Sequence, residues 1–351
     1  MHIIEITDFI DLIKKIPVID VRSEGEFEQG HIPLATNVPL LNNEERKAVG
    51  ICYKEKGNEA AVLLGYELVG GKFANIIRRI MQIAPEKKVL LHCWRGGLRS
   101  RIVSQLLENA GFEVFFLKGG YKKYRNFVLQ SFQCPKNLCV IGGYTGSGKT
   151  LLLQKLAEAG EQIIDLEFHA KHKGSTFGGI GQPPQPTQEQ FENELHAAFT
   201  ELDFSKKIWI EDESRRIGNV CLPLELWENM RQETLYEIEV LYAQRCNRIL
   251  EEYSELPIEE LTAKTKALKK RLGDKHLNEV LEFLSNGNTK AWAEALLAYY
   301  DKNYNYGMSK REILKRHKIN LEKNFSSDEF LSQAKVYNDK KGPKPLNEQK
   351  L

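Results

Sequence analysis

The stretch CVIGGYTGSGKT at residues 139–150 constrains the fold of this chain more than any other feature. It follows a hydrophobic run that predicts a β-strand, and it precedes the helical run LLLQKLAEAG. The spacing is that of the Walker A pattern, a loop whose backbone N–H groups and lysine bind phosphate. The matching residues are Gly143, Gly148, Lys149 and Thr150, with Gly146 inside the loop. We therefore expect a parallel α/β sheet with this loop at the carboxyl end of one strand.

This loop predicts a diphosphate site. Lys149 would neutralise the diphosphate, and Thr150 would hold a Mg²⁺ ion if one is bound. The sequence leaves open whether the diphosphate belongs to ATP. Two other predicted strands end in acids that could serve the same site, as a Walker B acid does or by contacting substrate. These acids are Asp165, Glu211, Asp212 and Glu213, and the sequence does not say which of them faces the loop.

A second loop with the chemistry of an anion site is LLHCWRGGLRSR at residues 90–101. Cys93 follows a hydrophobic strand and precedes a helix, whose N-terminal N–H groups favour an anion. Such a setting, with Arg95 and Arg99 nearby, favours the thiolate, so Cys93 is a candidate nucleophile. We expect Gly96 and Gly97 to adopt backbone conformations that side chains would block. Arg99 would supply a bidentate fork to the oxygens of a phosphate-sized group.

Short strands alternate with amphipathic segments from Phe9 to Leu129, which predicts a parallel α/β domain. Periodicity is lost around Cys134, so we place the domains at 1–133 and 134–340. The second domain carries a helical, basic extension, and we expect residues 341–351 to be a disordered tail. The long polar connection from Asp165 to Asn193 predicts a substrate loop.

Composition narrows the classes of function and location. The chain has 50 Lys and Arg against 48 Asp and Glu, so a nucleic-acid surface would have to be local. No apolar run in the sequence approaches membrane-spanning length, and the N-terminus lacks the basic start of a signal peptide. We therefore expect a cytoplasmic protein without membrane contact. The six cysteines include no C-x-x-C pair, so no metal site is assigned.

The helical extension offers cations and aromatic rings. Arg245 and Arg248 are three residues apart, on one helical face, where they would contact phosphates of a ligand or of RNA. The segment LTAKTKALKKRLGDK contains Lys269, Lys270 and Arg271, and the later run AYYDKNYNYG adds tyrosines. Basic helices with nearby aromatic residues predict contacts to RNA phosphates and stacking on unpaired bases.

The segment VIDVRSEGEFEQGHIPLATNVPL at residues 18–40 is similar to the N-terminal signature of rhodanese-like domains. In this segment, we expect Asp20 and Arg22 to hold the neighbouring loops in place. We interpret His31 as a structural residue of a turn. Five residues, one more than in the common rhodanese loop, separate Cys93 from Arg99. This wider loop resembles that of rhodanese-fold phosphatases, which bind a tetrahedral phosphate.

Together, CWRGGLRS, GYTGSGKT, the segment beginning DLE, and EDESRRIG resemble the motifs of bacterial tRNA 2-selenouridine synthases. The resemblance implies conversion of wobble 2-thiouridine in tRNA to 2-selenouridine with selenophosphate, through S-geranylation by geranyl diphosphate. It implies that Cys93 handles selenium and that the Walker loop binds the prenyl diphosphate. The implied selenophosphate-binding residues are Arg95, Gly96, Gly97 and Arg99. The implied partners are tRNA and a selenophosphate-supplying enzyme, and no tightly bound cofactor is predicted.

Two alternatives use the same residues. A bifunctional rhodanese-fold phosphatase and P-loop kinase would employ the Cys-x₅-Arg loop and the Walker loop in separate phosphate reactions. A nucleotide-gated RNA-binding protein without enzymatic activity would keep the basic helices and would not need Cys93. Release of phosphate from aryl phosphates separates the first alternative, and tolerance to loss of Cys93 separates the second.

Overall fold

The computed structural model describes residues 2–133, 137–253, 256–311, 315–321 and 325–339. The described chain divides into two compact units. The first unit holds the residues up to 133 together with Thr187–Ala197, and the second holds the remainder. The expected seam at Cys134 and the expected tail at 341–351 lie outside the described residues.

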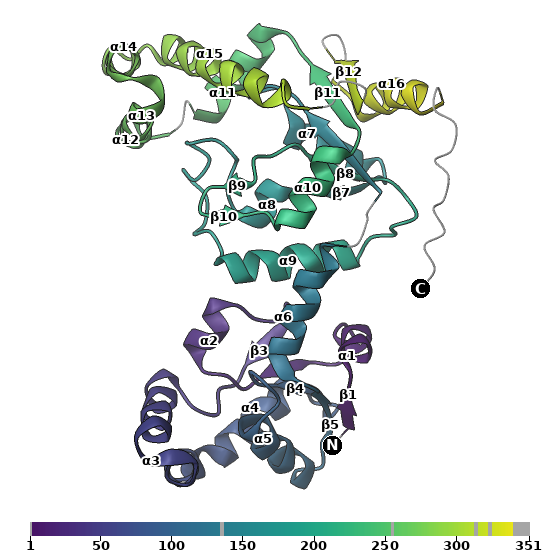
Figure 1. Ribbon diagram of the computed structural model, residues 1–351, viewed down its shortest axis with the longest axis vertical. Helices are drawn as coiled ribbons and strands as arrows, with labels where there is room; N and C mark the ends of the chain where they lie inside the picture. The colour runs from purple at the N-terminus through teal and green to yellow at the C-terminus, as the bar shows by residue number, and fades with distance from the viewer. Residues whose placement is uncertain (1, 134–136, 254–255, 312–314, 322–324, 340–351) are drawn as a thin grey trace. The chain divides into compact units, whose positions relative to one another are not determined.

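The first unit is built on a five-stranded sheet in which every strand pair is parallel (Figure 1). Its order is β1 (His2–Ile4), β5 (Glu113–Leu117), β4 (Lys88–His92), β2 (Val18–Asp20) and β3 (Ala35–Asn37). Ile19 pairs with Leu91, and Leu91 pairs with Phe116 on the other side. Because β4 is central, the residue that follows it lies at the middle of the carboxyl edge. The inner strands β2, β4 and β5 are short, largely buried apolar runs, as buried parallel strands usually are.

The helices of the first unit follow the strands in sequence. They are α1 (Ile6–Leu12), α2 (Glu24–Gln29), α3 (Asn43–Val69), a 3₁₀ turn (Gly70–Lys72), α4 (Phe73–Ile83), α5 (Leu98–Asn109) and α6 (Gly120–Ser131). The helical stretch Asn43–Ile83 contains an 18-residue window with a mean hydropathy of 1.3, which is long and apolar enough to cross a membrane by length and composition alone. The expectation that no apolar run approaches spanning length is therefore wrong. A single such helix is weak evidence for a membrane.

The second unit contains another all-parallel five-stranded sheet. Its order is β12 (Arg316–Asn320), β11 (Leu235–Glu239), β6 (Leu138–Gly142), β8 (Ile208–Glu211) and β7 (Gln162–Ile164). The accompanying elements are α7 (Lys149–Glu158), α8 (Leu166–Ala170), the hairpin β9 (Arg216–Ile217) with β10 (Val220–Cys221), α10 (Leu224–Gln232) and α16 (Ser327–Asp339). Here too the central strand, β6, leads into a glycine-rich loop. The two parallel sheets confirm the predicted α/β fold.

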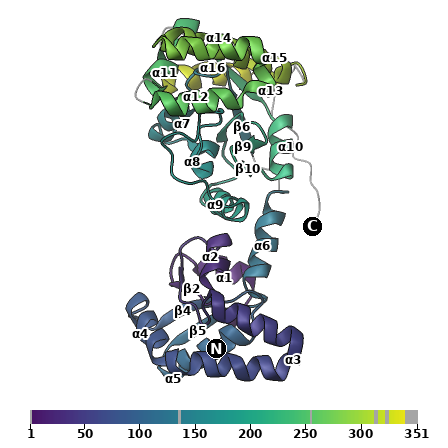
Figure 2. The same cartoon turned by 90° about the vertical axis from the view of Figure 1, so that its left-hand side faces the viewer.

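The helical extension has a core of its own. It comprises α11 (Tyr242–Tyr253), α12 (Ile258–Ala267), α13 (Lys269–Leu272), α14 (Asp274–Ser285) and α15 (Thr289–Met308), and Figure 2 shows α14 running along α15. Trp292 is fully buried there against Phe177 and Tyr253. The indole N–H of Trp292 donates to Thr265, so its polar atom is satisfied. Phe177 comes from the long polar connection, which the extension thereby holds in place.

Helix α9 (Gln188–Thr200) differs from the sequence prediction, which assigned it to the second domain. Its residues up to Ala197 pack within the first unit. Buried Asn193 donates to the Tyr121 hydroxyl at 2.8 Å and to the His31 carbonyl at 2.8 Å. Arg125 donates to Asn193 at 2.6 Å. The polar partners of this helix lie more than sixty residues away in sequence, so no local pattern could have predicted its position.

Candidate functional sites

Cys93 lies at the middle of the carboxyl edge of the first sheet, directly after β4. The loop leads into α5, whose N-terminus the sequence had predicted at this place. Cys93 is buried and only 3% exposed. The Ser100 hydroxyl lies 3.0 Å from Sγ and donates to it. Burial lowers the pKa of neighbouring His92 to about 4, so His92 adds no positive charge beside the thiol.

The two glycines of the loop have different roles. Gly96 has a φ of +69°, and a Cβ there would lie 3.0 Å from the Phe116 ring, so only glycine fits without strain. Gly97 has a φ of −95° and open space where a Cβ would be. The prediction that Gly97 provides a conformation closed to side chains is therefore wrong. The loop instead depends on Gly120, where a Cβ would lie 2.4 Å from the Cys93 carbonyl oxygen.

Arg99 is engaged with a carboxylate, although the sequence predicted a fork free for ligand oxygens. Its Nη1 lies 2.6 Å from Glu26 Oε2, and its Nη2 lies 3.2 Å from Oε1. Arg46 contacts the same carboxylate at 2.9 Å. Burial favours the neutral acid, but the two guanidinium groups outweigh it and lower the pKa of Glu26 to about 2. Arg95, in contrast, is exposed.

The residues of the rhodanese-like signature brace this loop. Arg22 forms a buried ion pair with Asp20 at 2.6 Å and donates to the Gly30 carbonyl at 2.7 Å. Its guanidinium lies 3.8 Å from the centre of the Tyr121 ring, and the Tyr121 N–H donates to the Cys93 carbonyl. His31 stacks on Phe27 at 3.9 Å between ring centroids. These contacts agree with a structural role for this segment.

The glycine-rich loop of the second unit, residues 143–150 and hereafter the P-loop, connects β6 to α7. Gly148 is the N-cap of α7 with a φ of +88°, a conformation that favours glycine. Gly143 and Gly146 also have positive φ. Lys149 Nζ donates to the Gly143 carbonyl at 3.3 Å, which folds the lysine back over the loop. The first turn of α7 thus presents N–H groups and a cation, as a diphosphate site requires.

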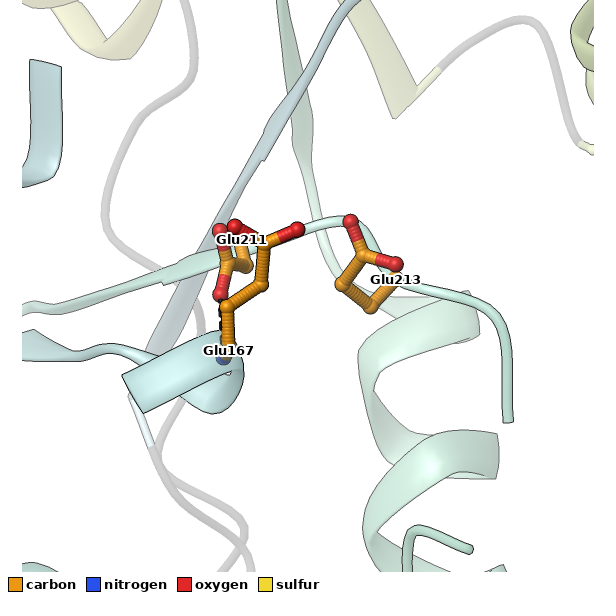
Figure 3. Close-up of side chains that lie close together, drawn as sticks. All are labelled: Glu167, Glu211 and Glu213. Carbon is orange, nitrogen blue, oxygen red and sulfur yellow. Dashed lines mark hydrogen bonds between the residues drawn. The ribbon is translucent and has the colours of Figure 1, made fainter. Parts of the chain in front are cut away.

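Three carboxylates gather beside the P-loop (Figure 3). Glu167 comes from α8, Glu211 ends β8, and Glu213 follows it; their oxygens lie within 4.8 Å of one another. The Thr150 hydroxyl lies 3.0 Å from Glu167 Oε2, and the Glu167 N–H donates to Glu211 at 2.9 Å. Sequence reasoning missed Glu167. Its signal was its place two residues after a strand-ending acid, at the same carboxyl edge as the P-loop.

Burial, and then repulsion from neighbouring carboxylates, raises the pKa of all three carboxyl groups. For Glu167 the pKa rises to about 8, although Lys149 and Thr150 oppose the shift. Such a cluster needs either protons or a cation. Carboxylate and hydroxyl oxygens are the ligands that Mg²⁺ prefers, so this donor set fits a divalent cation bound between the acids and Thr150.

The other two candidate acids have partners of their own. Asp212 is paired with Arg311 at 2.5 Å, so its carboxylate is engaged away from the cluster. Asp165 caps α8 by accepting the Phe168 N–H at 2.8 Å. Of the four acids predicted from the sequence, the structure therefore brings Glu211 and Glu213 together and gives Asp165 and Asp212 other contacts.

A pocket of about 1500 Å³ includes the P-loop. The substrate loop predicted from the sequence lines it with several residues between Lys171 and Gln185. The lysines and arginines among its lining residues are Lys149, Lys171, Lys173, Arg215, Arg216, Arg231, Arg248, Lys264, Arg271 and Lys310. The tryptophan and tyrosines among them are Trp227, Tyr253, Tyr299, Tyr300, Tyr304 and Tyr306. The pocket thus combines cations, rings and a phosphate-binding loop.

The predicted basic contacts divide into different roles. Arg248 lines the pocket and donates to the Ser147 carbonyl of the P-loop at 2.7 Å. Arg245 is buried and paired with Asp301 at 2.5 Å, and it donates to the Thr145 carbonyl. The structure does not support the predicted phosphate contact of Arg245, because the charge of this side chain is already neutralised. Arg245 instead supports the P-loop from behind.

The three basic residues of α13 also separate. Arg271 lines the pocket. Lys269 pairs with Asp274 at 3.0 Å on an exposed surface, and Lys270 is exposed. Only Arg271 of this group therefore has a place beside the P-loop pocket.

Comparison with known proteins identifies both units. Residues 5–127 match the model of the rhodanese-like domain, and residues 136–329 match that of the tRNA 2-selenouridine synthase AAA domain. A tRNA 2-selenouridine synthase from Nitrosomonas europaea is 34% identical over 86% of this chain and 91% of its own length. One from Shewanella denitrificans is 35% identical over 89% of this chain and 94% of its own. Among solved structures, a rhodanese-related protein from Thermoplasma volcanium aligns with 36% of the chain at 20% identity and a TM-score of 0.24.

Proposed function

The chain belongs to the tRNA 2-selenouridine synthase family, and we propose that it converts wobble 2-thiouridine in tRNA to 2-selenouridine in two steps. The first step is S-geranylation in the P-loop pocket, and the second is selenium transfer at the Cys93 loop. Both are group transfers, which makes the enzyme a transferase. Each step has an anion to bind, and the two loops provide one anion site each.

In the first step, the sulfur of 2-thiouridine attacks C1 of geranyl diphosphate. The C–O bond breaks, diphosphate leaves, and the base loses its N3 proton. Lys149 and the N–H groups of residues 146–150 bind the departing diphosphate and stabilise its developing charge. Mg²⁺ bound by Thr150 and the carboxylate cluster would add further charge neutralisation. Arg248 holds the P-loop backbone in the geometry that this binding requires.

In the second step, selenium replaces the geranylated sulfur at C2 of the base. The Cys93 thiolate attacks the phosphorus of selenophosphate, the S–P bond forms, and the P–Se bond breaks to release selenide. The selenide attacks C2 of the base, so the C2–Se bond forms and the C2–S bond breaks with geranyl thiol as the leaving group. Water then cleaves the S–P bond, which releases phosphate and restores the thiol. Cys93 is the nucleophile that handles the selenium donor, and the loop N–H groups with Arg95 and Arg99 bind the donor oxygens. A selenophosphate-supplying enzyme must provide this labile donor.

The observation that carries the proposal is the composition and size of the P-loop pocket. Small-molecule sites usually measure about 300–1,000 Å³. The pocket here is about 1500 Å³, and its lining residues include the P-loop and several aromatic side chains. Aromatic side chains suit a prenyl chain and an unpaired base, and the surrounding cations suit RNA phosphates. A diphosphate donor and a tRNA nucleotide can therefore be accommodated together.

Mass analysis of wobble nucleosides tests the proposal. Thiolated tRNA incubated with the protein and geranyl diphosphate should yield S-geranyl-2-thiouridine, and subsequent selenophosphate should yield 2-selenouridine. A parallel assay measures phosphate release from an aryl phosphate and from ATP. Unchanged nucleosides together with phosphate release would favour the bifunctional phosphatase and kinase over the synthase.

A further inference from the structure

Glu26 lies within the rhodanese-like segment at residues 18–40, and the two-step proposal gives it no role. It lies in α2, where both of its carboxylate oxygens accept from Arg99, at 2.6 and 3.2 Å. Arg99 is in the first turn of α5, one residue before Ser100, whose hydroxyl contacts the thiol. Glu26 is therefore linked to the Cys93 loop through one side chain, that of Arg99.

The charge of Glu26 is unfavourable for the ligand proposed at this loop. Its pKa of about 2 keeps it ionised at every pH at which the enzyme would work. A fixed carboxylate beside a site for selenophosphate repels the ligand by Coulomb's law. If Glu26 acted only as a charge, it would weaken selenophosphate binding, and removing the charge would strengthen it.

The geometry of the ion pair has the opposite effect. The contacts with Glu26 use one N–H of Nη1 and one of Nη2, so the guanidinium keeps further N–H donors for a ligand. A free arginine side chain loses rotamer entropy when it binds a ligand, and this loss weakens binding. Here the planar fork is fixed before the ligand arrives, and both partners are largely buried, with side-chain exposures of 22% and 14%. Preorganisation of this kind increases affinity.

We infer that Glu26 is a positioning residue, which holds Arg99 so that its remaining N–H groups are preorganised for the oxygens of selenophosphate. The inference rests on the proposed function of the Cys93 loop. It extends that function by giving Arg99 an orienting partner outside the loop itself. Because repulsion and preorganisation have opposite signs, the direction of the change on removing the charge decides between them.

Glu26→Gln is the informative variant. Glu26 also closes a capping box at the start of α2, in which its side chain accepts from the backbone of Ser23. Glutamine serves at this position of a capping box as well as glutamate does, so the helix keeps its cap while the charge is lost. Arg46→Gln is the matched control, since it removes the other cation on Glu26 without changing Arg99.

The test is calorimetric titration of the full chain with thiophosphate, the sulfur analogue of selenophosphate. Lys149→Ala serves as the background, so that the P-loop does not contribute an anion site. We expect Glu26→Gln to raise the Kd about tenfold, an effect of the size seen when orienting partners of a ligand-binding side chain are removed. Arg46→Gln should change the Kd by less than about threefold. Adding Glu26→Gln to Arg99→Gln should cause no further weakening.

Tighter or unchanged binding in Glu26→Gln overturns the inference, and so does additive weakening in the double variant. Thermal unfolding of each variant shows whether weaker binding reflects loss of the fold. If Glu26→Gln does not fold, Glu26→Asp replaces it. Glu26→Asp should bind thiophosphate more weakly than the parent protein, because the shorter side chain misplaces Arg99. If the parent protein itself does not bind thiophosphate, the proposed selenophosphate site is wrong and the positioning role falls with it.

Discussion

At the residue scale, neutralisation decides which charged side chains remain for ligands. Arg245 and Arg248 share a helical face, as their spacing predicted, yet only Arg248 lines the pocket. Arg245 is committed to Asp301, which lies 56 residues further along the chain. The spacing of residues in a sequence predicts which face of a helix a side chain lies on. It does not predict which side chains of other elements that face will contact. The same reason explains why the engagement of Arg99 with Glu26 could not be predicted.

Arg245→Met should therefore destabilise the second unit. It leaves the Asp301 carboxylate without its partner and removes the contact to the Thr145 carbonyl. Breaking a buried pair costs about 3–5 kcal/mol, and we expect the lower end because Asp301 remains partly exposed. Chemical denaturation measures the change. Lys269→Met is the control, because it removes only an exposed ion pair with Asp274 and should change the free energy of unfolding by less than about 0.5 kcal/mol. Similar losses of stability in both variants would contradict the assigned role of Arg245.

At the element scale, the strand–loop–helix units around Cys93 and the P-loop were predictable from sequence. Both are local: a hydrophobic run fixes the strand, and the glycines and the following helix fix the loop. The position of α9 and the side-chain contacts that bring Glu167, Glu211 and Glu213 together were not predictable, although the place of Glu167 near a strand end was a signal for its edge of the sheet. Each depends on side chains brought together by tertiary packing, for which one sequence carries no periodic signal.

The acidic cluster should make stability depend on pH and on divalent cations. The folded-state pKa of Glu167, about 8, lies above its unfolded value, so the folded state binds more protons between these two values. Without divalent cations, the contribution of Glu167 to the free energy of unfolding of the second unit should be largest below about pH 4.5. This contribution should fall as the pH rises towards 8.

Denaturation between pH 5 and pH 8, with and without Mg²⁺, measures this dependence. Mg²⁺ should flatten it, because a bound cation replaces the protons. Glu167→Gln should also flatten it in metal-free buffer. A pH profile that neither Mg²⁺ nor this substitution changes would show that the cluster is neither proton-linked nor a cation site.

At the scale of the whole molecule, a net charge of +2 leaves any attraction for tRNA to local groups of cations. The structure places Lys264 and Arg271 at the P-loop pocket and leaves Lys269 on an exposed surface beside Asp274. If tRNA enters this pocket, the logarithm of its affinity should fall linearly with the logarithm of salt concentration. Lys264→Ala and Arg271→Ala should each reduce the slope by about 0.7–0.9.

Fluorescence titration of labelled tRNA across salt concentrations provides the slope, and Lys269→Ala is the matched control. Lys269 has the same charge in the same helical extension, but it does not line the pocket. An equal reduction in slope for Lys269→Ala would move the RNA surface away from the pocket, to the outer face of the extension.

The two anion loops belong to different units, so each proposed step should have its own essential side chain. Loss of one preorganised charge contact typically lowers a rate by about 10²–10³. Lys149→Ala should therefore block geranylation of thiolated tRNA but leave selenation of pre-geranylated tRNA largely intact. Cys93→Ser should do the reverse; serine nearly preserves the packing of this buried side chain while removing the thiol. Mass analysis of the nucleosides from both reactions with both variants gives four rates. Equal loss of selenation in the two variants would mean that the P-loop also serves the second step, for example by placing the RNA. The reason is that selenation releases no diphosphate, so a site that only binds diphosphate would have no function in it.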